Sequence, residues 1–255
     1  MKIYNDIVYG GRNKDDEKLK LDIYVPEHDG FETIVYFHGG GLSGGTKSDW
    51  RYAEIAKSFA DNGFGLVSVE YSKYPDAKFP VYIEDCAEAV SFVKNKIKNY
   101  GGSGDIIISG QSAGAWISLM LCFNRTYLEK VAVNPDEIKG YLIDSAQTTS
   151  HFNVLKTEEG LNPLAQRIDK YAPLYYVDEN TRFSRMLLIV YEKDMPCRPE
   201  QNMLLFKNIL AYNPDADIKL VKLSGEHCAG STIKDDSGEF PFVKVALKWL
   251  AKSEK

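Results

Sequence analysis

Ser112 lies between two glycines in the segment Gly-Gln-Ser-Ala-Gly, residues 110–114. A run of three isoleucines and a serine comes directly before this segment, and an apolar stretch of helical length follows it. At such a strand-to-helix turn the serine hydroxyl projects from the end of the sheet, and the next backbone N–H points at the group under attack. The five-residue pattern alone is weak evidence, but with the strand and the helix it predicts that Ser112 is a nucleophile.

A serine hydroxyl near neutral pH needs a base that takes its proton, and the base needs an acid that orients it. The chain has four histidines. His227 follows the last predicted strand and is the candidate base. His28 lies in a polar turn, and His38 opens a glycine run in which it would hold the loop. His151 lies in a long insertion, where it would pack, be exposed or touch substrate.

The orienting acid is expected after the preceding strand, in Tyr-Glu-Lys-Asp-Met-Pro, residues 191–196. This segment offers two carboxylates, Glu192 and Asp194. Asp194 lies further out in the turn and is the candidate, with Glu192 as the alternative. Nucleophile, acid and histidine then follow one another in the chain order of one large class of serine hydrolases.

The glycine run His-Gly-Gly-Gly, residues 38–41, meets the remaining chemical need. A tetrahedral oxyanion requires backbone N–H donors aimed at the developing charge, and glycines let the backbone approach closely. Gly40, Gly41 and Ala113 are the candidate donors of this oxyanion hole. A phosphate-binding loop is the alternative, but neither a Gly-Lys-Ser/Thr ending nor a GxGxxG pattern follows.

The elements that would position these residues alternate between strand and helix. Apolar β-rich runs occupy 2–10, 18–26, 33–41, 65–71, 105–109, 141–145, 185–191 and 218–223. Helical spacing or length occupies 48–62, 80–100, 113–123, 199–212 and 240–251. This alternation predicts a mainly parallel eight-stranded sheet with helices on both faces. The first two strands are joined by a charged turn at 13–18, too short for a crossover, so they should pair antiparallel at one edge.

We expect one α/β domain over residues 1–255, with a lid insertion at about 146–184. The insertion is too long for an ordinary loop and carries its own aromatic residues. Tyr171, Tyr175 and Tyr176 would either line the site or pack the lid onto the body. Tyr71, His151 and Tyr176 are the candidate substrate contacts.

The composition excludes several classes of protein. The net charge is −5 and the lysines are scattered, so a nucleic-acid surface is not expected. No segment approaches the roughly 20 apolar residues of a membrane span, and the first residues lack the apolar core of a signal peptide. We therefore expect a cytoplasmic protein without a nucleic-acid or membrane partner, as a monomer or a homodimer.

The four cysteines, Cys86, Cys122, Cys197 and Cys228, have no paired spacing. They are expected to be free thiols, as in a reducing compartment. Neither a CxxC pair nor a histidine-rich cluster occurs, so the sequence predicts no metal site. The chemistry expected of Ser112 also requires no cofactor.

Taken together, these motifs resemble the α/β-hydrolase fold, and within it the hormone-sensitive-lipase-like esterases and their relatives among bacterial carbohydrate esterases and kynurenine formamidases. The resemblance covers roughly residues 20–255 and rests on HGGG (38–41), VSVEYSKYPDAKFPVYIEDCAEAVSFV (67–93), GQSAG (110–114), YAPLYYVDE (171–179), YEKDMP (191–196) and GEH (225–227). It implies that Ser112, Asp194 and His227 form a catalytic triad beside the three backbone donors proposed above.

The sequence also departs from these relatives. The usual Tyr-Arg-Leu-Ala-Pro-Glu stretch of the lipase-like branch is Tyr-Ser-Lys-Tyr-Pro-Asp here, at 71–76. Formamidase relatives usually carry an aromatic residue shortly after the glycines, where this chain has Leu42 and Ser43. The first predicted strand begins almost at Met1, so the long amino-terminal cap of many lipase-like relatives is not expected.

We predict a serine hydrolase, a carboxylesterase that cleaves small esters with short acyl groups through an acyl-enzyme. One alternative is an amide hydrolase such as a kynurenine formamidase or a peptidase. Another is a binding protein that keeps the fold without catalysis, which the complete set of triad residues argues against.

Overall fold

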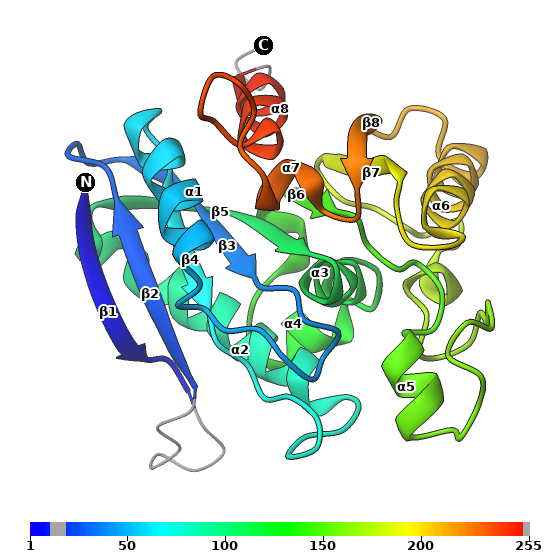
Figure 1. Cartoon of the computed structure of the whole chain (residues 1–255). Coiled ribbons are helices and arrows are strands. Elements are labelled where there is room, and N and C mark those ends of the chain that lie inside the picture. The colour runs from blue at the N-terminus through cyan, green and yellow to red at the C-terminus, as the bar shows by residue number, and fades with distance from the viewer. Residues whose placement is uncertain (11–18, 252–255) are drawn as a thin grey trace.

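The computed structural model describes residues 1–10 and 19–251, so the charged turn predicted at 13–18 lies outside the described residues. In this part of the chain eight strands form one sheet, in the order β1-β2-β4-β3-β5-β6-β7-β8 (Figure 1). The strands are Lys2–Val8 (β1), Lys20–Val25 (β2), Phe31–Phe37 (β3), Gly65–Val69 (β4), Gly102–Gln111 (β5), Ile138–Asp144 (β6), Met186–Lys193 (β7) and Ile218–Glu226 (β8).

The sheet is mainly parallel, as the alternation of strands and helices predicts. β1 pairs antiparallel with β2 at one edge, which confirms the prediction for the first two strands. β2 is also antiparallel to β4, while every other pair of neighbouring strands is parallel. The carboxyl ends of β3, β5, β6, β7 and β8 therefore meet at one edge of the sheet, where an open parallel sheet binds its ligands.

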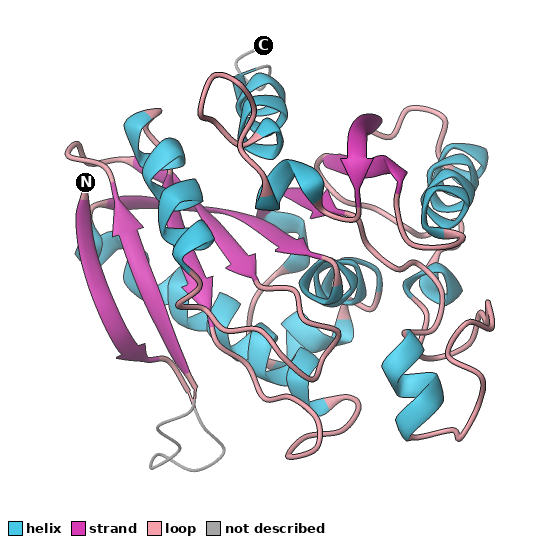
Figure 2. Cartoon of the chain, in the orientation of Figure 1, coloured by secondary structure: helices cyan, strands magenta, loops and turns pink. Residues whose placement is uncertain are grey.

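Helices cover both faces of the sheet (Figure 2). The α-helices are Trp50–Asp61 (α1), Val81–Lys96 (α2), Ala113–Phe123 (α3), Thr126–Lys130 (α4), Phe152–Thr157 (α5), Arg198–Tyr212 (α6), Ala229–Thr232 (α7) and Pro241–Leu250 (α8). Short 3-10 turns lie at Ile97–Tyr100 (η1), Pro135–Glu137 (η2) and Pro173–Tyr176 (η3). The long predicted helices are therefore present, and the helix predicted over 80–100 ends in the tighter turn η1.

The core has two layers, one on each face of the sheet. On one face α1 and α8 bury Phe59, Phe242 and Trp249 against inward side chains of the strands. On the other face α2, α3 and α6 pack over a larger apolar cluster. Every residue of α3 is buried, so the turn that leads into this helix rests on a rigid part of the fold.

The insertion at 146–184 contains α5 and η3 and packs onto the body of the protein. The backbone N–H of Phe79, just before α2, donates to Glu158 at 2.8 Å, and the hydroxyl of Tyr74 also donates to this carboxylate. The ring of Tyr171 packs edge-on against that of Phe79. Polar and aromatic contacts thus fix one side of the insertion to the segment that precedes α2.

Candidate active site

The turn between β5 and α3 holds Ser112 in a strained conformation, with φ 53° and ψ −109°. The Ser112 N–H donates to the carbonyl of Asp144 at the end of β6, at 2.8 Å. A Cβ at Gly110 would lie 2.4 Å from backbone atoms of Gly114, and a Cβ at Gly114 would lie 2.0 Å from the carbonyl oxygen of Phe37. Both flanking positions therefore require glycine, which gives the five-residue pattern around Ser112 its physical reason.

The structure brings Ser112, His227 and Asp194 together at the carboxyl edge of the sheet. Asp194 follows β7 directly and His227 follows β8 directly. The Oγ of Ser112 lies 2.9 Å from His227 Nε2, and His227 Nδ1 lies 2.5 Å from Asp194 Oδ1. The alternative acid Glu192 is exposed to solvent and its side chain takes no part in this chain of contacts.

The Asp194 side chain is buried, so it needs hydrogen bonds to remain ionised. Its Oδ1 also accepts from the Met195 N–H at 2.7 Å, and its Oδ2 accepts from the Ser145 hydroxyl at 2.6 Å. Burial raises the pKa of this carboxyl, but the hydrogen bonds from His227 and Ser145 outweigh that effect and lower the pKa overall. Asp194 is therefore a carboxylate across the neutral range.

The glycine loop approaches Ser112 with backbone conformations that side chains rarely adopt. Gly40 has φ +118° and Gly41 has φ +62°. A Cβ at Gly40 would lie 2.2 Å from the carbonyl oxygen of Gly44, so the loop closes only around a glycine. Within the described residues, no hydrogen bond is donated by the backbone N–H groups of Gly40, Gly41 and Ala113.

Asn153 of α5 connects the insertion to this loop. Its side-chain amide donates to the carbonyl of Gly41, and a Cβ at Gly41 would lie 3.0 Å from the ring of Phe152. The insertion therefore contacts the loop whose N–H groups are unpartnered, in addition to its contacts near α2.

Two of the three candidate substrate contacts are packed inside the protein. Tyr71 is 1% exposed, its ring stacks on His38, and its hydroxyl donates to the His38 carbonyl at 2.8 Å. His151 is 1% exposed and caps α5, where its Nδ1 accepts from the Asn153 N–H. Burial holds the pKa of His151 well below its usual range, so this ring is neutral.

Tyr176, the third candidate, is half-buried, and its hydroxyl donates to the Lys170 carbonyl at 2.9 Å. Among the contacts of the described residues, none joins Tyr71, His151 or Tyr176 to the Ser112 hydroxyl or to the His227 ring. His38 holds the loop as predicted, since its Nδ1 lies 2.6 Å from the Gly39 carbonyl.

A buried polar network that the sequence analysis missed lies beneath the site. The Gln111 amide donates to Ser231 Oγ at 2.6 Å, and Ser231 in turn donates to Asp144. Burial raises the pKa of Asp144 to about 6, against the hydrogen bonds from Ser231 and Tyr191 that lower it. Residues as far apart in the chain as Gln111 and Ser231 have no common motif, so their spacing gave no signal.

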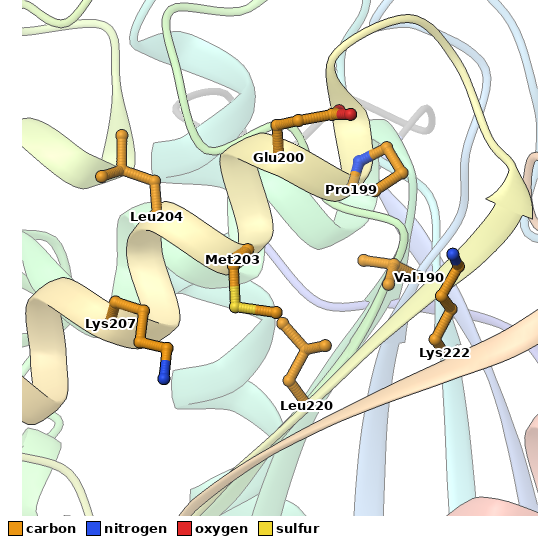
Figure 3. Close-up of a pocket in the computed structure, with 8 residues that line it drawn as sticks. All are labelled: Val190, Pro199, Glu200, Met203, Leu204, Lys207, Leu220 and Lys222. Carbon is orange, nitrogen blue, oxygen red and sulfur yellow. The ribbon is translucent and has the colours of Figure 1, made fainter.

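A cavity of about 190 Å³ borders the site and is lined mainly by apolar atoms of Gln147, Phe152, Pro163, Leu164, Gln166, Met195, Pro196, Arg198 and Gln201. Met195 follows Asp194 and Phe152 lies against Gly41, so the cavity is lined by neighbours of the acid and of the glycine loop. A second cavity, of about 550 Å³, lies between α6 and strands β7 and β8, where Met203 and Leu220 face each other (Figure 3). Neither Ser112 nor His227 lines either cavity.

Residues 1–10 and 19–251 hold neither a cluster of metal-ligating side chains nor a helix that could span a membrane. Within these ranges no three histidine, cysteine or acidic side chains are grouped so that they could hold a metal ion. The helices of the same ranges include none with the length and apolar character needed to cross a membrane. All four cysteines are free thiols, as the sequence predicts.

The sheet order and the strained serine turn define a protein of the α/β-hydrolase fold. Solved structures agree with this fold over nearly the whole chain. The truncated form of a carbohydrate esterase from gut microbiota has a TM-score of 0.78 at 16% identity and covers 99% of this chain and 96% of its own. Thermogutta terrifontis esterase 2 in its apo form has a TM-score of 0.78 at 18% identity, with 99% of this chain and 94% of its own covered.

The chain belongs to the BD-FAE family, whose model matches residues 21–209. Among curated proteins, a probable isoprenylcysteine alpha-carbonyl methylesterase of Arabidopsis thaliana is 29% identical over 55% of this chain and 33% of its own length. Neutral cholesterol ester hydrolase 1 of Pongo abelii is 27% identical over 73% of this chain and 40% of its own length. The chain thus spans about a third of the first of these relatives and about two fifths of the second.

Proposed function

We propose that the protein is a serine esterase that hydrolyses small carboxylic esters through an acyl-enzyme. The observation that carries this proposal is the continuous contact from Ser112 Oγ through the His227 ring to Asp194, beside three unpartnered backbone N–H groups. Such an arrangement can activate a hydroxyl and stabilise the oxyanion that its attack creates. The relatives of this chain support ester rather than amide cleavage, because both curated proteins compared above are named as ester hydrolases.

In the proposed mechanism Ser112 attacks the ester carbonyl while His227 takes its proton at Nε2. The tetrahedral oxyanion accepts hydrogen bonds from the N–H groups of Gly40, Gly41 and Ala113. His227 then donates the proton to the departing alcohol, which leaves Ser112 acylated. A water molecule attacks the acyl-enzyme by the same route and releases the carboxylic acid.

The acyl group of the substrate is expected to be short. The cavity lined by Met195, the neighbour of Asp194, and by Phe152, the neighbour of Gly41, measures about 190 Å³, a volume that would hold a small substrate portion. A continuous acyl channel would add up to about 0.8 kcal/mol per buried methylene, or roughly fourfold in specificity for each carbon. We therefore expect kcat/KM for p-nitrophenyl esters to be highest from acetyl to butyryl and to fall by octanoyl.

This series has a clear contrary outcome. A steady increase of kcat/KM through decanoyl would mean that a lipid-like acyl pocket exists, and the short-acyl proposal would be wrong. Parallel assays with feruloyl esters and N-formylkynurenine would identify the alcohol class and test the amide alternative. Faster turnover of N-formylkynurenine than of any ester in the panel would favour the amide hydrolase.

A pH profile tests the base. Only the neutral imidazole of His227 can accept the Ser112 proton, so kcat/KM should fall as the solution becomes acidic. Asp194 remains ionised because its pKa is lowered, whereas Asp144, with a pKa raised to about 6, also takes up a proton as the solution becomes acidic. A ring NMR titration of His227 should therefore accompany the rate measurement and assign the fall to the imidazole.

Alanine variants separate the two candidate histidines. His227→Ala should lose nearly all activity, about 10⁴-fold in kcat, because the proton then has no acceptor. His151→Ala should change mainly KM, because the His151 ring packs between Phe152 of the insertion and Trp116 of α3 and does not contact Ser112. An inactive His151→Ala variant beside an active His227→Ala variant would show that the base is misassigned.

A further inference from the structure

Ser145 occupies a position between the two strands that carry the proposed nucleophile and acid. It follows β6 directly, and β6 lies between β5, which leads to Ser112, and β7, which leads to Asp194. Its side chain is fully buried. No sequence motif marks Ser145, because a single serine after a strand is common.

The Ser145 hydroxyl touches both partners in the acid–base pair. Its Oγ lies 2.6 Å from Asp194 Oδ2 and 2.8 Å from His227 Nδ1. A hydroxyl has one proton, and the Asp194 carboxylate is an acceptor only, so this proton is donated to Asp194. The lone pair that faces His227 can then only accept, which requires that Nδ1 carries a proton.

This arrangement fixes the tautomer of the imidazole. With Nδ1 protonated and shared between Asp194 Oδ1 and Ser145 Oγ, the lone pair of the neutral ring is on Nε2. That atom lies 2.9 Å from Ser112 Oγ, where the proton must be accepted. The opposite tautomer would place a lone pair on Nδ1 against the lone pairs of both oxygen atoms.

The backbone of Ser145 indicates that its side chain has a specific use. Its φ is +55°, in the left-handed region that glycine adopts without strain and other residues rarely enter. Two hydrogen bonds hold the backbone in this conformation. The Ser145 N–H donates to the Ile189 carbonyl at 2.8 Å, and the Arg198 guanidinium donates to the Ser145 carbonyl at 2.6 Å. Since a glycine would fit this backbone with less strain, a serine here points to a function of the hydroxyl.

We propose that Ser145 is a positioning residue of the proposed esterase, which holds Asp194 and His227 in the orientation and tautomer needed for proton transfer. This inference rests on the proposed function, because it concerns the same acid–base pair. Ser145 does not touch the reacting atoms and acts only through its two neighbours.

Two substitutions separate the hydroxyl from the backbone. Ser145→Gly removes the hydroxyl and relieves the positive φ, whereas Ser145→Ala removes the hydroxyl and keeps the strain. Both should lower kcat for p-nitrophenyl acetate by about 10- to 100-fold, the range of a lost hydrogen bond to a charged group, with KM within about threefold. The matched control is Ser109→Ala. It removes another buried hydroxyl, which donates a hydrogen bond to the Leu142 carbonyl, and it should leave kcat unchanged.

Two further measurements test whether the role of Ser145 is purely structural. In ¹⁵N spectra of the His227 ring, the wild type should show the proton at Nδ1, and Ser145→Gly should show a mixture of tautomers. Adding Ser145→Gly to Asp194→Asn should lower kcat by less than about threefold more, because Ser145 acts through Asp194. If Ser145→Gly lowers kcat by the same factor in the Asp194→Asn background as in the wild type, the two residues act independently and the proposal is wrong.

The outcomes distinguish this inference from the proposed function. If fluorophosphonate labelling depends on Ser112 and Ser145→Gly keeps wild-type kcat, only the role of Ser145 is wrong. If Ser112→Ala remains fully active, the esterase mechanism itself is wrong. If neither Ser145 variant folds, the tautomer of His227 in the wild-type protein decides, and a proton on Nε2 of the free enzyme would overturn the proposal.

Discussion

Ser112→Ala should abolish labelling by a fluorophosphonate probe and lower kcat for p-nitrophenyl acetate by about 10⁴-fold or more. The alanine keeps the β5–α3 turn but removes the oxygen that lies 2.9 Å from His227 Nε2. No other group in the proposed mechanism can form the acyl-enzyme. The measurement is gel fluorescence of the labelled protein together with the steady-state rate.

Ser109→Ala serves as the control here too, since it removes a buried hydroxyl from β5, the strand before Ser112, and Ser109 does not contact His227. It should be labelled like the wild type. Unchanged labelling of Ser112→Ala would show that another residue is the nucleophile. A wild-type protein that is folded yet neither labels nor cleaves any ester in the panel would favour the binding-protein alternative.

Much of the fold could be predicted because its elements are long and apolar. α3 was predicted at its observed bounds, Ala113–Phe123, since the stretch that follows Ser112 is apolar and of helical length. β7 and β8 extend further than predicted, to Lys193 and Glu226. Their final residues are polar and partly or fully exposed, so no apolar pattern marks them. The short helices α4, α5 and α7 were not predicted, because four to six residues are too few to show a helical period.

The candidate site was predictable to the extent that each residue follows a strand. The parallel sheet brings the ends of β5, β7 and β8 to one edge, and this alone places Ser112, Asp194 and His227 near each other. The substrate contacts were harder, since an aromatic residue near a site packs into the core as readily as it lines a pocket. Tyr71 illustrates this, because its ring and hydroxyl are both used to hold His38.

The second large effect is expected from Asp194→Asn, which should lower kcat by about 10³- to 10⁴-fold with little change in KM. An asparagine can turn its NH₂ group toward His227 Nδ1, and that nitrogen must then accept a hydrogen bond rather than donate one. The proton of the neutral ring would move to Nε2, the atom that has to accept the Ser112 proton. The loss therefore comes from the wrong tautomer and not from a displaced ring.

Glu192→Gln is the matched control for this substitution. It makes the same chemical change two residues earlier in the same segment, at an exposed side chain, and should leave kcat within about twofold of the wild type. The reverse pattern, an active Asp194→Asn and an inactive Glu192→Gln, would make Glu192 the acid. Full activity in both variants would mean that His227 needs no carboxylate, which would contradict the role assigned to its 2.5 Å contact with Asp194.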